Sequence, residues 1–273
     1  MTKRLLHLAG YVTIVLLTIL SLIPFAWMLI SATHTTPELF QRPLPLYLGS
    51  HFWENFVRIQ KNYNFLRTIF NSLLVATVYT VFSTVLSALA GYGLAKFKFR
   101  GKGLILGSIL ITMMIPVQVL LIPLFKMMAN FGWIDSYQAV ILPFIVSGFG
   151  IFLMRQAFLK FPNELIESAR IDGAKELRTF YQIVLPVTKP QLVVLIVYTF
   201  ITQWSAFIWP LLMLNSPDKY TIPLALNNMV GLSRIDYSGL MLGSLLATAP
   251  ILILFAIFQR QFIAGLLGGA LKG

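Results

Sequence analysis

The residues Thr68–Ala95, TIFNSLLVATVYTVFSTVLSALAGYGLA, decide the fold of this chain. They form a run of 28 residues without a charged side chain. An α-helix needs about 20 apolar residues to cross the hydrocarbon core of a bilayer, because each residue adds only about 1.5 Å. The run is therefore long enough to form a transmembrane helix.

The rest of the chain has the same character. It has 273 residues, of which 58% are hydrophobic and 11% are charged, whereas a soluble domain has about 25% charged residues. This composition excludes a disordered protein and argues against a soluble enzyme. Five further charge-free runs occur: Leu8–Thr33, Gly103–Phe125, Ser136–Met154, Pro190–Pro217 and Tyr237–Gln259. We expect an all-α polytopic membrane protein, one transmembrane domain over residues 1–273, with six transmembrane helices at about residues 8–31, 68–95, 103–126, 136–157, 190–214 and 238–260.

The net charge of +12, from 21 Lys and Arg against 9 Asp and Glu, raises the question of nucleic-acid binding. The distribution of the charge favours another interpretation. If the amino terminus is cytoplasmic, 14 of the basic residues fall on the cytoplasmic side and 7 outside, which follows the positive-inside rule. We therefore expect both termini to be cytoplasmic and no nucleic-acid partner, with the basic stretch Lys96–Lys102 orienting the chain.

Motifs for catalysis or nucleotide binding are missing from the sequence. It has no phosphate-binding loop, no H-E-x-x-H, no G-x-S-x-G and no cysteine, and its three histidines are not spaced like a metal site. The six runs contain no charge, although charges within a membrane normally mark proton or ion coupling. We expect no catalytic, cofactor or metal site in this chain, and we expect any uphill transport to draw its energy from a separate subunit.

The loop Arg155–Lys189, between the fourth and fifth expected spans, is charged and helix-favouring. We expect a first helix, a turn at Gly173 with positive φ, and a second helix that ends at Pro186. From these residues alone, the loop could be a solvated connector or a lever that passes force from a soluble partner. The first helix carries two neighbouring stripes of helical spacing, one of Leu165, Ala169 and Asp172 and a small, apolar one of Ile166, Ala169 and Gly173.

This loop resembles the E-A-A-x-x-x-G-(nine residues)-I-x-L-P signature of permease subunits of binding-protein-dependent ATP-binding-cassette importers. Here it reads Glu167-Ser168-Ala169, three residues, Gly173, nine residues, and then Ile183-Val184-Leu185-Pro186. Ser168 departs from the usual alanine, which exchanges one small residue for another. The resemblance implies that the loop 155–189 couples the permease to an ATPase. The residues that it assigns to this coupling are Glu167, Ser168, Ala169, Asp172, Gly173, Ala174, Leu185 and Pro186.

Other segments resemble the carbohydrate permeases of this family, specifically the inner subunit of the maltose type. The tail Gly265–Gly273 is similar to their G-L-T-x-G-x-x-K-G ending, and Phe25–Met28, Asn71–Leu73, Gly91–Gly101 and Ala169–Ala174 fit the same group. The resemblance therefore covers nearly the whole chain. It implies a type I importer permease fold and the import of an oligosaccharide or related carbohydrate.

The same resemblance implies a set of partners. A second permease subunit, two ATP-binding-cassette ATPase subunits and an extracytoplasmic solute-binding protein would complete the transporter, with ATP and Mg²⁺ held by the ATPase subunits. The complex would lie among the lipids of a bacterial or archaeal cell (inner) membrane, and ATPase closure would drive alternating access through residues 164–186. The alternative is a self-sufficient secondary transporter or channel, which would transport without these subunits.

A sugar pathway needs neutral hydrogen-bonding groups and aromatic faces rather than full charges. The residues near mid-span that supply them are Gln203, Ser205, Gln118, Trp204 and Tyr198. On a continuous helix Tyr198 and Ser205 share a face, whereas Trp204 lies about 100° from Gln203. We therefore expect Gln203 or Ser205 to face the pathway. Where the family often has W-N-E-F, this chain has Trp204-Ser205-Ala206-Phe207, which removes both the amide and the carboxylate.

Overall fold

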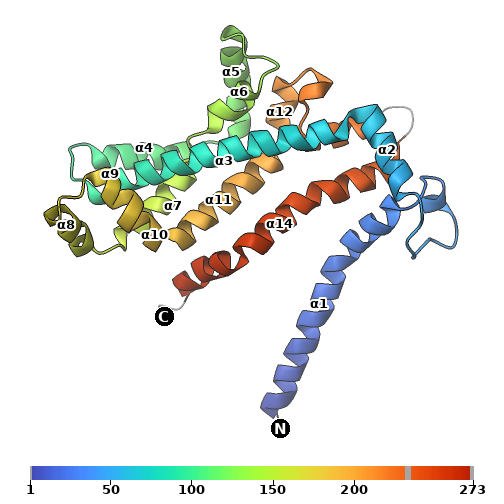
Figure 1. The fold of residues 1–273 in the computed structure, drawn as a ribbon, viewed down its shortest axis with the longest axis horizontal. Helices are drawn as coiled ribbons and strands as arrows, with labels where there is room; N and C mark the ends of the chain where they lie inside the picture. The colour runs from blue at the N-terminus through green and yellow to red at the C-terminus, as the bar shows by residue number, and fades with distance from the viewer. Residues whose placement is uncertain (1, 231–234, 271–273) are drawn as a thin grey trace. The chain divides into compact units, whose positions relative to one another are not determined.

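The structure is a computed structural model that describes the backbone of residues 2–230 and 235–270 and the side chains of residues 7–230 and 235–261. The regular elements within these residues are all helical (Figure 1). The last three residues of the tail motif, 271–273, lie outside the described residues. Two compact units are present, Met1–Leu66 with Ala225–Pro250, and Arg67–Leu224 with Ile251–Gly273. The expectation of a single transmembrane domain stays a prediction.

Within the described residues, three helices are long and apolar enough to cross a membrane, namely α1 (Thr2–Ala32), α3 (Phe65–Lys96) and α14 (Tyr237–Ala270). The other elements are shorter. They are η1 (Glu38–Phe40), α2 (Phe52–Tyr63), α4 (Lys102–Met114), α5 (Val117–Asn130), α6 (Tyr137–Ile141), η2 (Leu142–Phe144), α7 (Gly148–Leu159), α8 (Asn163–Ile171), α9 (Glu176–Thr179), η3 (Phe180–Val184), α10 (Leu185–Val187), α11 (Lys189–Trp204), α12 (Ile208–Met213), η4 (Pro217–Lys219) and α13 (Ile222–Met229).

Three pairs of these shorter segments could each form one bent span. The pair α4 and α5 turns by 99°, residues 137–144 and α7 by 46°, and residues 176–187 and α11 by 86°. Counting each pair once brings the candidate spans among the described residues to six. The all-helical class and this number agree with the sequence-based expectation, although three of the spans are broken.

A proline accompanies the interruption in two of the expected spans. The expected span 103–126 is interrupted at Ile115, which is extended (φ −83°, ψ 118°) because the residue before a proline avoids the α region, and Pro116 then caps α5. The expected span 190–214 ends as a helix at Trp204, and a new helix begins at Ile208. Pro210 falls in the first turn of that new helix, where its missing N–H leaves no intrahelical bond unmade.

The long helix α3 supports two hydrophobic cores of the unit Arg67–Leu224 (Figure 1). Its N-terminal half contributes Val75 and Tyr79 to a core shared with α6 and α12. Its C-terminal half contributes Ala88 and Tyr92 to a second core that includes α7, α8 and η3. Because one continuous helix enters both cores, it is well placed to transmit a displacement from one end of this unit to the other.

Small residues allow α3 and α7 to approach closely. A Cβ atom on Gly91 would lie 2.9 Å from the backbone nitrogen of Arg155 and 2.9 Å from Cβ of Met154. A Cβ atom on Gly150 would meet the hydroxyl of Ser87, and Ser87 itself is fully buried. Close backbone approach through small residues is a common way for helices to pack within membranes. This contact therefore fixes the spacing of the two helices.

Candidate functional site

The helix α8, which carries the matched signature, ends in a Schellman motif. The N–H of Gly173 donates to the carbonyl of Arg170 at 3.0 Å, and the N–H of Ala174 donates to the carbonyl of Ala169 at 2.9 Å. Gly173 has φ +80°, a conformation that glycine adopts without the steric cost of a Cβ atom. The expected positive φ at Gly173 is confirmed, and the chain turns sharply between α8 and α9.

The second half of the loop differs from the expected simple helix. Residues Phe180–Val184 form a π-helical turn between α9 and α10, which the sequence did not indicate. Pro186 does not end this segment, because α10 continues to Val187 and the chain turns at Thr188. Pro186 has no N–H to close the α-helical bond to Gln182, and a widened turn just before it accommodates the missing donor.

The two faces of α8 have different surroundings. Ile166 and Ala169 are 3% and 5% exposed, and Ile166 belongs to the same core as Phe158 and Phe180. Of the two neighbouring stripes, the small, apolar one through Ile166 and Ala169 therefore faces the chain's own core. The signature residues on the other side are exposed: Glu167, Ser168 and Asp172. Ala169 thus contributes by close packing within the chain, while its exposed neighbours are free to meet a partner.

The exposed side of this segment also carries large apolar residues. Leu165 is 48% exposed, Ile171 86% and Leu177 64%. Leu165 and Ile171 lie outside the candidate spans, and Leu177 lies in the segment 176–187 that is bent by 86° away from α11. Among the other signature residues, Ala174 and Leu185 are half-buried and Pro186 is exposed. A group of exposed apolar side chains outside the membrane usually marks a protein interface.

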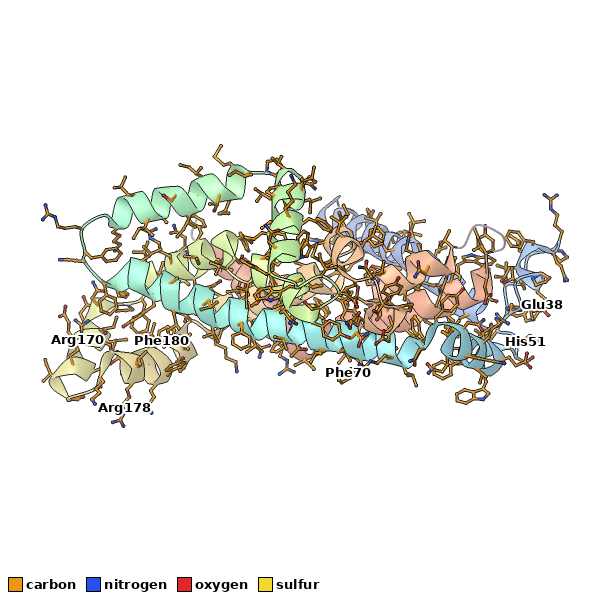
Figure 2. All side chains as sticks on the ribbon, turned by 90° about the horizontal axis from the view of Figure 1, so that it is seen from above. Glu38, His51, Phe70, Arg170, Arg178 and Phe180 are labelled. Atoms are coloured by element: carbon orange, nitrogen blue, oxygen red, sulfur yellow. The ribbon has the colours of Figure 1, made fainter. Side chains whose placement is uncertain are left out.

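The segment is tied to the C-terminal end of α3 by polar and aromatic contacts. Lys96 Nζ donates to the carbonyl of Phe161 at 2.6 Å and to Oδ1 of Asn163, at the start of α8, at 2.7 Å. The ring of Tyr92 lies 5.0 Å from that of Phe180 and 5.7 Å from that of Phe158. In Figure 2, Arg170, Arg178 and Phe180 gather at this end of α3, whereas Phe70 marks the other end. These contacts would therefore transmit a displacement of α8 to α3.

An ion pair spans the turn at Gly173. Arg170 Nε donates to Oε1 of Glu176 at 2.6 Å, and this bond raises the pKa of Arg170 above its ordinary value. Both side chains are more than a third exposed, so solvent screens the pair and its contribution to stability is small. Its effect is to hold the ends of α8 and α9 at a defined angle.

A cavity of about 1050 Å³ lies within the unit Arg67–Leu224, between α4, α5, η2, α7 and residues 202–210. Gln118, Gln203 and Ser205 line it, together with the hydroxyl residues Ser108 and Thr112 of α4. Most of the remaining lining is apolar. A few neutral polar groups in an apolar cavity can bind hydroxyl groups without placing a charge in the membrane.

The other two expected pathway residues do not line this cavity. Trp204 is 4% exposed and stacks on Phe200, with ring centroids 5.6 Å apart. Tyr198 packs its ring against Phe149 at 4.6 Å. Ser205, the C-cap of α11, lines the cavity and Tyr198 does not, and the hydroxyl of Ser205 donates back to the carbonyl of Ile201. Of the five expected pathway residues, the cavity lining thus includes Gln118, Gln203 and Ser205 but not Tyr198 or Trp204.

A polar clasp that sequence reasoning missed joins the loops beside α6 and α12. Oδ1 of Asp135 accepts the backbone N–H groups of Asn215 and Ser216 at 2.9 and 3.0 Å, and Oδ2 accepts from Lys219 Nζ at 2.9 Å. Burial opposes ionisation, but these bonds hold the pKa of Asp135 well below its usual value. Asp135 also has φ +60°, which aspartate tolerates better than most residues.

Comparison with known proteins identifies the family. The model of the family described as "Binding-protein-dependent transport system inner membrane component" matches residues 83–267. The chain belongs to this family. This agrees with the resemblance seen in the signature around Gly173, which lies within the matched residues.

Several relatives of this family are similar over almost the whole chain. The arabinooligosaccharides transport system permease protein AraQ of Bacillus subtilis (strain 168) is 36% identical, over 94% of this chain and 93% of that protein. The lactose transport system permease protein LacG of Rhizobium radiobacter is 35% identical over 97% of each. The sn-glycerol-3-phosphate transport system permease protein UgpE of Yersinia enterocolitica is 32% identical over 97% of each.

Solved structures confirm the fold. A bacterial ABC transporter involved in the import of the acidic polysaccharide alginate has a chain that matches with a TM-score of 0.77 and 22% identity, over 94% of this chain and 97% of that one. A chain of the MetNI methionine ABC transporter matches with a TM-score of 0.56 over 73% of this chain. The expected permease fold is therefore confirmed, and this binding-protein-dependent permease is a multi-pass membrane protein and a component of an ABC transporter.

We expect the cavity glutamines to affect transport more than their neighbours. Gln203→Ala and Gln118→Ala should each raise the half-saturating substrate concentration, because a lost buried hydrogen bond costs about 1–3 kcal/mol, or roughly 5- to 150-fold if it acts fully on binding. Ser205→Ala should act less, since its hydroxyl is bonded to its own helix. Concentration-dependent uptake by the reconstituted transporter measures this. Tyr198→Phe, outside the cavity, serves as control. Unchanged uptake by both glutamine variants would place the substrate contacts on another subunit.

Proposed function

We propose that this permease is a membrane-spanning subunit of an ATP-driven importer of an oligosaccharide or related carbohydrate. A second permease subunit, two ATP-binding-cassette ATPase subunits and an extracytoplasmic solute-binding protein complete the transporter. ATP and Mg²⁺ bind to the ATPase subunits, and this chain carries out no catalytic step of its own. Both termini and the loop 155–189 are cytoplasmic in a bacterial or archaeal cell (inner) membrane.

One observation carries the coupling role, namely the two-sided construction of α8 and α9. The inner side, with Ile166 and Ala169, is buried in the chain's own core. The outer side exposes Ile171 and Leu177 beside Glu167, which gives an apolar patch with a polar rim. Such a surface suits docking into a groove of a soluble subunit. The ATPase would meet this outer side.

The contacts behind α8 supply a route from the ATPase to the pathway. Closure of the two ATPase subunits displaces α8, and the bonds of Lys96 and the ring of Phe180 pass this displacement to α3. The other half of α3 contributes Tyr79 to the cavity lining. A rigid helix shared by both regions converts docking into a population shift between two states of the pathway.

The carbohydrate class is supported by the relatives and by the cavity. The named substrates of two relatives are sugars, and that of a third is a phosphorylated polyol. The cavity offers amides and hydroxyls to such molecules. A melting screen of the solute-binding protein with arabino-oligosaccharides, lactose, alginate oligosaccharides and sn-glycerol 3-phosphate tests the class. Stabilisation by a carbohydrate that then stimulates ATP hydrolysis by the complex is expected. Stabilisation by none of them, with stimulation by an amino acid, would overturn the assignment.

The proposed topology makes a separate prediction, which the absence of native cysteines simplifies. Glu54→Cys should react with an impermeant thiol reagent added to intact cells, and Lys175→Cys should not. Both positions are exposed on the protein, so reactivity reports only the side of the membrane. Permeabilised cells, in which both variants should react, provide the control. Labelling of Lys175→Cys from outside would reverse the topology.

A further inference from the structure

The short helix α2 is fixed at the level where two candidate membrane spans end. Asn55 is fully buried, and its amide Nδ2 donates to the carbonyls of Ala32 and His34, both at 2.8 Å, at the end of α1. At its other end, Oε1 of Gln60 accepts the N–H of Leu66, in the first turn of α3, at 2.9 Å. Asn64, which has φ +47°, forms the turn between α2 and α3. Because both neighbours are candidate spans, α2 lies at a membrane boundary.

Three sides of α2 have different characters. The side of Asn55 and Ile59 is buried in the protein. On the adjoining side, Arg58 forms a bidentate ion pair with Asp236. Its Nε donates to Oδ2 at 2.8 Å and its Nη2 donates to Oδ1 at 3.0 Å. Asn55 and Arg58 therefore direct their polar groups towards the protein.

The outward side divides into an apolar and a polar strip. Trp53 is 67% exposed and Val57 49% exposed, and the ring of Trp53 stacks on that of Phe56 at 5.3 Å. On the adjoining edge, Glu54 accepts a bond from His51 at 2.7 Å, and Lys61 is exposed. Figure 2 shows His51 beside Glu38. Nε2 of His51 lies 3.7 Å from Oε1 of Glu38. The apolar strip thus stands directly beside a charged one.

We propose that Trp53, Phe56 and Val57, the apolar strip of α2, lie in the lipid of the adjacent leaflet at the boundary between headgroups and acyl chains. Exposure of these side chains to water is unfavourable, and the bonds to Ala32 and Leu66 hold them where two apolar spans end. Tryptophan is enriched at this depth in membrane proteins, and helices that lie in the interface pair an apolar face with a charged one. Glu54 and Lys61 then point to water. The strip anchors the first loop of the chain at a fixed depth.

Spin labels on α2 in the complete reconstituted transporter, with cysteines removed from its other subunits, test this proposal. A nitroxide on Val57→Cys should collide severalfold more with dissolved oxygen, relative to a water-soluble nickel chelate, than one on Glu54→Cys, its neighbour on the polar edge. Trp53→Cys provides a second position on the apolar strip, and Lys61→Cys a second on the polar edge. Normal ATPase activity of the labelled complex confirms that the variants fold.

The outcomes separate the possible occupants of the apolar strip. High oxygen and low nickel collision at Val57 and Trp53 supports lipid. High nickel collision at both, equal to that at Glu54, means water and overturns the proposal. Low collision with both probes means that a protein subunit covers the strip, which overturns it as well. These depth readings do not depend on which side of the membrane α2 faces, so they are independent of the proposed topology and transport function.

Discussion

A Gly91→Ala variant should lose about 1–3 kcal/mol of stability, which is the usual cost of overpacking a tight core. The added Cβ atom would meet the backbone nitrogen of Arg155 and the Cβ atom of Met154 at 2.9 Å, and the backbone carbonyl of Ile151 at 3.1 Å. Backbone atoms cannot rotate away as a flexible side chain can, so α3 and α7 would have to separate. Gly91→Leu should abolish folding. The measurement is the midpoint of thermal unfolding in detergent, together with the yield of monodisperse protein.

Gly93 provides the matched control, because it lies on the same helix two residues away. A Cβ atom at Gly93 would have no neighbour within 4 Å. Gly93→Ala should therefore be neutral or should stabilise the helix by up to about 1 kcal/mol, the usual difference in helix propensity. Equal loss of stability in the two alanine variants would show that the close contact of α3 and α7 does not determine the packing of this unit.

A Gly173→Pro variant should insert at normal abundance but lose most of the ATPase stimulation that the sugar-loaded binding protein causes. Proline fixes φ near −65°, whereas Gly173 has φ +80°, and it removes the N–H that donates to Arg170. The angle between α8 and α9 would change, so Ile171 and Leu177 could not both meet the ATPase. Glu167→Lys should act similarly, because it reverses a charge on the exposed side of α8 without altering the backbone.

Gly101→Ala is a suitable control for this effect. Gly101 also has a positive φ, +83°, and lies in the turn between α3 and α4, outside the loop 155–189. Its substitution should impose a comparable backbone cost of about 1–2 kcal/mol while ATPase stimulation is retained. Stimulation at the unmodified level in both Gly173→Pro and Glu167→Lys would remove the coupling role from α8 and α9.

Much of the fold could be predicted because membrane spans are set by local composition. A charge-free run such as Thr68–Ala95 predicts a helix whatever its neighbours, and the structure has α3 there. The turn at Gly173 could also be predicted, since few residues besides glycine adopt positive φ at a helix end. The family signature around this turn supplied the family, which the comparison confirmed.

The breaks within spans were harder to predict. Eight prolines occur within the charge-free runs, and those at positions 116 and 210 accompany a break, whereas Pro24 and Pro250 lie within continuous helices. Whether a proline kinks or interrupts a helix depends on which neighbours can satisfy the freed carbonyl groups. These neighbours come from other helices, so the outcome is not encoded locally.

The candidate sites show the same limit. Gln118 and Gln203 line one cavity because α4 and α5 meet at 99°, an angle that cannot be read from either run. The stripe of α8 through Ile166 faces the core because Phe180 enters the same core from the far side of the turn. The clasp of Asp135 joins residues 80 or more positions apart, and its only local signal is a charged residue between two apolar segments.

ATP-dependent uptake by the reconstituted transporter tests the central claim most directly. Proteoliposomes are prepared with this chain alone and with the complete complex of permeases and ATPases, and the radiolabelled sugar selected by the binding-protein screen is supplied with its binding protein. The complete complex should accumulate the sugar only when ATP and Mg²⁺ are present on the ATPase side, and the chain alone should not transport it. Uptake of the sugar by the chain alone, without ATPase subunits, would contradict the account.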